Sequence, residues 1–216
     1  MAITLDGSVT SNAETGTTSI TVASNTNRLL IVSYATYQGG GPSGITYNGV
    51  ALTKIVEQLG SFSEQCSIWG LVAPDTGTNN VVVSGGGSYY AYGIYSLYNC
   101  DQNLPSVTSK TGGDSLTASL AITTVTDNSW VITCIESEPV PTMTTSGGTA
   151  DWSKEGQSFQ HGSGQHILKV TAGSQTMSAS LSYGARWNQT NIEVKPFAAA
   201  ATPTINIPTL MLMGVG

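Results

Sequence analysis

The stretch ITYNGVALT, residues 45–53, has the pattern of a tight β-hairpin. Its centre, Asn48-Gly49, favours a type I′ turn, because that turn needs a positive φ at both central residues. Side chains alternate between the two faces of a strand, so one face of this hairpin is apolar and the other is polar. The apolar face is expected to carry Ile45, Tyr47, Val50 and Leu52. The hairpin therefore predicts a sheet with one buried face.

The same pattern continues along the chain. Runs rich in Val, Ile, Thr, Tyr and Trp alternate with turn-forming clusters roughly every 8–12 residues, and helix signals are almost absent. We expect an all-β fold: a single antiparallel β-sandwich of two sheets, jelly-roll-like, over residues 15–197. An N-terminal strand or arm (residues 1–14) precedes it, and an apolar C-terminal arm (residues 198–216) follows. The expected strands span residues 17–23, 28–37, 45–47, 50–57, 66–73, 79–84, 90–98, 116–123, 130–136, 166–171, 176–182 and 188–195.

Composition narrows the function classes. Only 9% of the 216 residues are charged, against about 25% in an ordinary soluble domain. A surface made of Ser, Thr, Asn, Gln and Gly is common in secreted and virion proteins. The net charge of −6, with seven Lys and Arg, provides no basic face, so we expect no nucleic-acid partner and no docking on an acidic membrane.

The first residues, MAITLDGSVTSN, contain no basic segment followed by an apolar one. We therefore expect release without a Sec signal, assembly inside the producing cell, or a trimmed chain. No apolar run reaches the roughly 18 residues of a membrane-spanning helix, so none is expected.

Five tyrosines crowd into the segment 89–98. Alternation predicts that Tyr90, Tyr92 and Tyr98 share one face of a strand, with Gly93 on the other, where a neighbouring ring can lie flat on the glycine. The three tyrosines can form a cross-strand ladder, a subunit interface or a sugar-stacking platform.

The four tryptophans divide into two pairs. Trp69 and Trp130 lie in strand patterns and are expected in the core. Trp152 and Trp187 flank polar loops, so we expect them to be exposed, as further candidates for a ligand or interface surface.

Catalytic motifs are weak. Glu136 and Glu138 lie two residues apart and share a face if the strand reaches them, as the acid pair of a glycoside hydrolase would. Pro139 and Pro141 follow at once, which favours a solvated strand end instead. The sequence offers no nucleophile elbow, and nothing in it supports a Ser/His/Asp triad built on His161 or His166.

Metal and disulfide signals are also weak. The candidate metal ligands are Asp151, Glu155, His161 and His166, but five residues separate the histidines, which places them on opposite faces of a strand. We expect no metal and no cofactor. The three cysteines lie in strand-like stretches and are expected to be small buried side chains: Cys66, Cys100 and Cys134.

The C-terminal arm is apolar, and Pro203 and Pro208 forbid a central strand there. Because such a segment would be sticky if exposed, we expect it to dock on its own domain or on a neighbouring subunit. Its candidate assembly residues are Ile205, Ile207, Leu210, Met211, Leu212 and Met213.

The succession of segments resembles a β-sandwich domain that recurs in bacterial surface and secreted proteins and in phage structural proteins. The segments are SNTNRLLIVSYATY (24–37), ITYNGVALTKI (45–55), SIWGLVAPDTGTNNVVVSG (67–85), a D-x-x-x-P corner (101–105), LAITTVTDNSWVITCIES (120–137) and NIEVKPF (191–197). The resemblance covers about residues 15–197. It implies the fold and lends no catalytic residues.

The expected function is a non-enzymatic structural component of a phage virion, such as a capsid decoration, spike or tail protein. It would form a homo-oligomer, contact other virion proteins and reside in the particle. The alternative is an extracellular or cell-surface module that binds glycans through the tyrosines and tryptophans named above. A glycan hydrolase using Glu136 and Glu138 is a third hypothesis.

Overall fold

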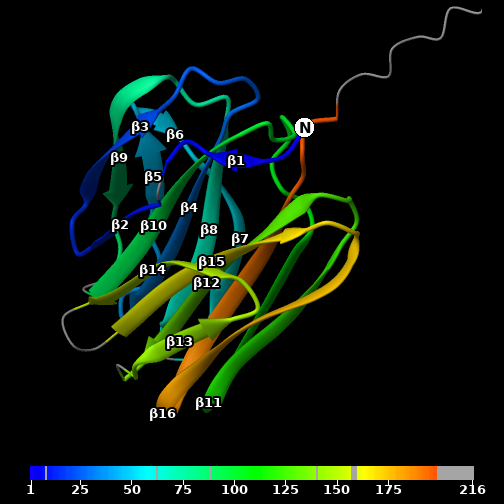
Figure 1. The fold of residues 1–216 in the computed structure, drawn as a ribbon. Coiled ribbons are helices and arrows are strands. Elements are labelled where there is room, and N and C mark those ends of the chain that lie inside the picture. Colours follow the sequence, from blue (N-terminus) through cyan, green and yellow to red (C-terminus); the bar gives the residue numbers. More distant parts are fainter. Residues whose placement is uncertain (8, 62, 88, 140, 157–159, 199–216) are drawn as a thin grey trace, which may run out of the picture.

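The computed structural model describes residues 1–198 apart from 8, 62, 88, 140 and 157–159. In that part of the chain every regular element is a β-strand, and every strand pairing is antiparallel. Among the same residues, no helical segment has the length and apolarity needed to cross a membrane. The predicted all-β antiparallel sandwich is confirmed (Figure 1).

The central sheet has the strand order β1-β10-β4-β8-β7, and β2 also pairs with β10. The N-terminal segment is therefore built into this sheet, because β1 and β2 both lie on β10. Its strands are β1 (Thr4–Leu5), β2 (Thr10–Ala13), β4 (Leu29–Tyr37), β7 (Thr53–Leu59), β8 (Gln65–Val72) and β10 (Tyr89–Tyr98).

A smaller sheet, here called the cover sheet, has the order β3-β9-β5-β6. Its strands are β3 (Thr17–Val22), β5 (Gly44–Tyr47), β6 (Val50–Ala51) and β9 (Gly77–Ser84). The predicted turn joins β5 to β6, with φ of 48° at Asn48 and 78° at Gly49. Ile45, Tyr47 and Leu52 are buried as expected. Val50 is 49% exposed, contrary to expectation, because it starts a two-residue strand at the free edge of the sheet.

The third sheet, here called the long-strand sheet, has the order β11-β16-β12-β15-β14, with β13 paired to β16. Its strands are β11 (Thr108–Thr124), β12 (Ser129–Glu138), β13 (Met143–Ser146), β14 (Thr149–Gly156), β15 (Gln160–Lys169) and β16 (Gly173–Val194). The sequence predicted two separate strands, 176–182 and 188–195, where β16 runs continuously.

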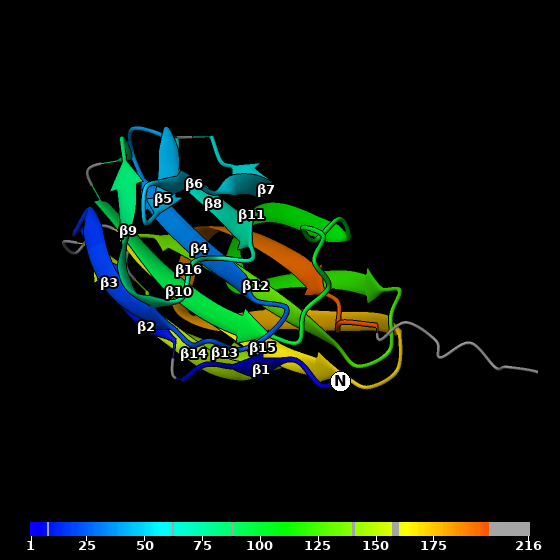
Figure 2. The same cartoon turned by 90° about the horizontal axis from the view of Figure 1, so that it is seen from above.

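The three sheets form three layers, so the expected count of two sheets is corrected (Figures 1 and 2). The central sheet lies between the other two, and β4 has apolar side chains on both faces. Ile31 belongs to the core that the central sheet shares with Ile132 of the long-strand sheet, and Val32 belongs to the core shared with Val81 of the cover sheet. Burial on both faces explains why β4 reads as a continuous apolar run and not as an alternation.

The long-strand sheet also folds over itself. The N-terminal part of β16 pairs with β13, and its C-terminal part pairs with β12. The ladder between β11 and β16 is irregular between Ser115 and Thr117. A second apolar cluster fills the fold, including Ile135, Leu181 and Trp187. Polar side chains share this interior: Gln189 donates to the Met177 carbonyl at 2.9 Å.

Candidate functional site

The tyrosine face of β10 lies inside the protein. Tyr92 is fully buried beneath the cover sheet, and its hydroxyl lies 2.6 Å from Thr18 Oγ1 and donates to the Thr15 carbonyl at 2.6 Å. Its ring stacks on Tyr90 and on Tyr34 of β4. Tyr90 and Tyr98 are half-buried. A sugar platform made of Tyr90, Tyr92 and Tyr98 is therefore wrong for the described structure, and the cross-strand ladder is the arrangement found.

Trp152 and Trp187 are also buried, at 5% and 8% exposure, so the expectation that they are exposed is wrong. Each indole lies against the backbone of a glycine on a facing or neighbouring strand: Trp152 on Gly93 and Trp187 on Gly113. Each indole N–H donates to a serine hydroxyl at 3.0 Å. The expected flat contact on Gly93 is confirmed, and the ring that makes it is Trp152. Trp69 and Trp130 are core residues, as predicted.

The carboxyl groups of Glu136 and Glu138 lie at the buried end of β12. The strand extends to Glu138, so both side chains share the face turned towards the central sheet. Asn188 donates to Glu136 at 3.1 Å, and Arg186 forms an ion pair with Glu138. Both glutamates are at most 2% exposed. The predicted solvated strand end is therefore wrong, because the face that carries both groups is turned towards the central sheet, and Asn188 and Arg186 of β16 lie directly beside them.

The electrostatics of this cluster favour a neutral carboxyl group at Glu136. Burial raises the pKa of Glu136 well above its usual range; the Asn188 hydrogen bond lowers it, and the carboxyl groups of Glu138 and Glu64 raise it. Burial also raises the pKa of Glu138, although the Arg186 hydrogen bond and charge act in the opposite direction. A raised pKa is a property of general acids. Neither carboxyl group lines any of the pockets described below, although Asn188 and Arg186, which bond to them, line one.

The candidate metal ligands do not converge. His166 bonds to Asp151 at 2.7 Å and stacks on Trp130. His161 instead contacts Ser153 and the Pro141 carbonyl. Within the described ranges, no three His, Cys, Asp or Glu side chains are placed to hold a metal ion.

All three cysteines are free and buried, as predicted. Cys66 on β8 and Cys134 on β12 lie on the faces of their sheets that are turned towards each other. Burial raises the pKa of the Cys66 thiol well above its usual range, so this group stays protonated and unreactive.

One side of the sandwich, here called the open side, holds a groove of about 800 Å³. It runs between β7, the last strand of the central sheet, and the first residues of β11, the last strand of the long-strand sheet. Lys110 reaches across and donates to the Glu57 carbonyl at 2.9 Å. Leu59, the last residue of β7, is 56% exposed and lines this groove. The Glu57 carbonyl thus accepts from a side chain of another sheet, at the edge of the central sheet where no described strand pairs with the outer side of β7.

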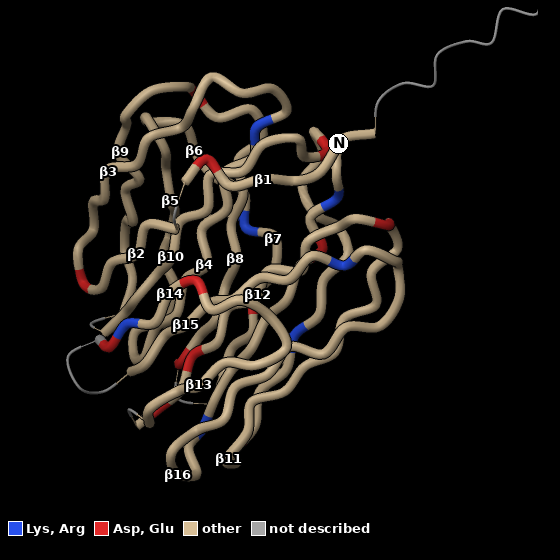
Figure 3. Tube along the Cα trace, in the orientation of Figure 1, with Lys and Arg blue, Asp and Glu red and all other residues tan. Residues whose placement is uncertain are grey.

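A polar pocket of about 300 Å³ continues from the groove, sharing Gln58 and Leu59 with it. Glu64, Asp114, Arg186 and Asn188 line its walls. Charged residues are sparse elsewhere on the protein, as the tube in Figure 3 shows. The sequence did not single out Glu64, Asp114 or Arg186, because they come from three strands or loops far apart in the chain.

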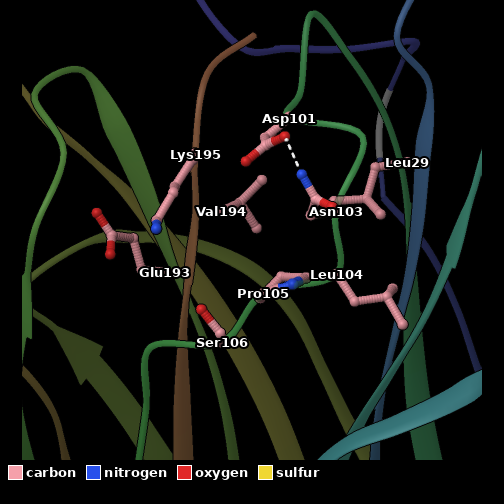
Figure 4. A pocket seen from close by; sticks show the side chains of 9 residues that line it. All are labelled: Leu29, Asp101, Asn103, Leu104, Pro105, Ser106, Glu193, Val194 and Lys195. Carbon is pink, nitrogen blue, oxygen red and sulfur yellow. Dashed lines mark hydrogen bonds between the residues drawn. The ribbon is translucent and has the colours of Figure 1, made fainter. Parts of the chain in front are cut away.

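A smaller cavity, of about 250 Å³, lies between the connection 101–106 and the end of β16 (Figure 4). Asn103 donates to Asp101 at 2.9 Å on one wall, and Glu193 and Lys195 lie on the other. Glu193 also accepts backbone N–H groups from Val125 and Thr126, at 3.0 and 2.9 Å. These groups hold the end of β16 and bring no reactive pair together.

The predicted assembly residues of the C-terminal arm, from Ile205 to Met213, lie outside the described residues. Comparison of the chain with protein-family models, curated proteins and solved structures finds no match.

Proposed function

We propose that this chain is a structural component of a phage particle and that it assembles as a homo-oligomer through the open side of its sandwich. The observation that carries the proposal is the groove between β7 and β11. The resemblance to phage structural domains and the nearly uncharged surface support it.

Edge strands favour association because their outer N–H and C=O groups have no strand partner and can hydrogen-bond to a strand of another chain. Proteins that remain monomeric usually block such edges with charges, prolines or short strands. Here β11 is 17 residues long, contains no proline and carries only Lys110 and Asp114 as charges. Its residues 112–117 are all exposed. This edge can therefore accept an added strand.

The C-terminal arm of a neighbouring copy has the composition of such a strand. Its isoleucines, leucines and methionines match the apolar floor that Ile55, Val56 and Leu59 give to the groove. Pro203 and Pro208 are compatible with an added strand. Such a strand pairs on one of its sides, and a proline, which lacks the N–H group, is tolerated where its nitrogen faces the unpaired side. In a particle, this exchange would link each subunit to the next.

The test is the solution mass, by light scattering after size exclusion, of the full chain and of a chain ending at Phe197. Residues 1–197 contain every strand that the structure describes. We expect a defined oligomer for the full chain and a monomer after truncation. A full chain that is monomeric, or a mass unchanged by truncation, would contradict the proposal.

A point variant tests the groove separately. Leu59→Lys places a charge at an exposed position of the groove and should weaken the oligomer while leaving the fold intact. Val170→Lys is the matched control, because Val170 is 62% exposed and lies outside the groove. Equal masses for the two variants would argue against the groove as the contact.

Glycan binding is the second candidate function, and the pocket beside Glu64, Asp114, Arg186 and Asn188 favours it. Carboxylate, guanidinium and amide groups in one small pocket can hydrogen-bond the hydroxyls of a sugar. The test is a glycan array with the full chain and with Asp114→Ala, which changes an exposed side chain. Binding that Asp114→Ala abolishes would support this function; no binding at high protein concentration would exclude it.

A further inference from the structure

Ser153 and His161 lie diagonally opposite each other on the hairpin of β14 and β15. In the ladder Ser153 is paired with Ser163, and His161 with Glu155. Ser153 is exposed, whereas His161 is only 6% exposed. The serine hydroxyl thus lies at the surface with the imidazole beneath it, and Ser153 Oγ is 2.6 Å from His161 Nε2.

The direction of this hydrogen bond follows from the other ring nitrogen. His161 Nδ1 lies 2.9 Å from the Pro141 carbonyl, which can only accept a hydrogen bond, so Nδ1 carries the proton. Burial lowers the pKa of His161 and so favours a neutral ring, and the Pro141 hydrogen bond acts in the opposite direction without reversing the shift. In the neutral ring Nε2 has a free lone pair, and the Ser153 hydroxyl donates to it.

This is the arrangement of an activated serine: a nucleophile within hydrogen-bond reach of a base that a third group orients. We propose that Ser153 is a nucleophile for acyl transfer, with His161 as its general base and the Pro141 carbonyl as the orienting group. The substrate class is an activated carboxylic ester, approached from solvent. This activity goes beyond the structural role proposed above and does not depend on it.

The proposed reaction has two stages. Ser153 Oγ attacks the ester carbonyl carbon while its proton moves to His161 Nε2; the C–O bond of the ester breaks, and the leaving alcohol takes that proton. Water then attacks the acyl carbon and loses a proton to Nε2; the bond between that carbon and Ser153 Oγ breaks, Oγ takes the proton back from Nε2, and the acid is released. β14 is the last strand of its sheet among the described residues, so we assign the oxyanion to the backbone N–H groups on its outer side, which pair with no described strand.

The test is covalent labelling of the full chain with a fluorophosphonate, followed by intact mass and peptide mapping. We expect one adduct, on Ser153, that is absent in Ser153→Ala. His161→Gln should slow labelling by about 100-fold or more, the usual contribution of a general base. Ser146 is the internal control, because its hydroxyl is also exposed and lies 2.8 Å from the Ser178 hydroxyl, with no imidazole as partner.

An unlabelled protein, or labelling of Ser153 and Ser146 at equal rates, would overturn the proposal. So would a labelling rate that is the same in His161→Gln and in the unchanged chain. Circular dichroism of each variant confirms that it is folded before labelling. The oligomer mass provides an independent readout, so failure of this proposal leaves the structural role untouched.

Discussion

The indole of Trp152, on β14, occupies the space above Gly93, on the facing strand β10. A Cβ atom placed on Gly93 would lie 2.2 Å from Trp152 Cδ1, far inside van der Waals contact. The indole N–H donates a hydrogen bond across the sheet interface to the Ser33 hydroxyl, at 3.0 Å. This contact joins the central sheet to the long-strand sheet near the middle of the larger core.

The contact predicts that Gly93→Ala is destabilising. The added methyl group meets a rigid ring in a closely packed core, where overpacking costs about 1–3 kcal/mol. Denaturant unfolding measures the effect. Gly184→Ala is the matched control, because a Cβ there meets nothing within 4 Å, and it should change stability little. Equal stabilities for the two variants would show that the indole moves away from Gly93 without cost.

The buried carboxyl group of Glu136 predicts a pH dependence of stability. Its pKa is raised above the usual 4.5, so between that value and its folded pKa the folded state binds more protons than the unfolded state. Stability must then fall as pH rises through this range, because the free energy of unfolding decreases with pH wherever the folded state holds more protons.

Glu136→Gln removes the titrating group and keeps an oxygen that can accept from Asn188. We expect the variant to be at least as stable as the unchanged chain at neutral pH. The variant should also lose less stability between about pH 5 and about pH 8. Denaturant unfolding at both pH values provides the comparison, and Glu155→Gln, at an exposed position, is the control. Parallel pH profiles for the unchanged chain and Glu136→Gln would contradict the buried neutral acid.

The turn at Asn48-Gly49 predicts a cost for losing its glycine. Gly49 has a φ of 78°, and a side chain in the left-handed region costs about 1–2 kcal/mol. Gly49→Ala should therefore destabilise the protein by that amount in thermal or denaturant unfolding. Gly44→Ala, in the same hairpin but with open space around its Cβ and no positive φ, should have a smaller effect. A reversed order would mean that the hairpin relaxes to another turn.

The sequence predicted local features well. A positive φ at Asn48 and Gly49 depends on the two residues themselves, and the alternation along β10 that separated Tyr92 from Gly93 depends only on strand geometry. Burial of the cysteines follows from their apolar surroundings. Such features are fixed within a few residues, so a pattern along one strand is enough to predict them.

The sites could be predicted only in part. Glu136 and Glu138 were recognised as a pair on one face, but their burial depends on Asn188 and Arg186, about 50 residues later in the chain. Nothing in the sequence marked Ser153 as a candidate nucleophile. The register of β14 and β15 brings it to His161, and the sequence did not predict the strand β14. Trp152 and Trp187 stand beside polar residues in the sequence and yet lie in cores built by other strands.

By itself, the sequence determined that this protein is all-β, where the Asn48-Gly49 turn lies and which side chains alternate along its central strands. Only the tertiary structure decided that a third sheet covers the tyrosines, that β16 passes from β13 to β12, and that β7 and β11 remain at the open side. The physical reason is that turn and strand preferences depend on neighbouring residues. The pairing of strands far apart in the sequence depends instead on which arrangement buries the apolar faces of all the strands together.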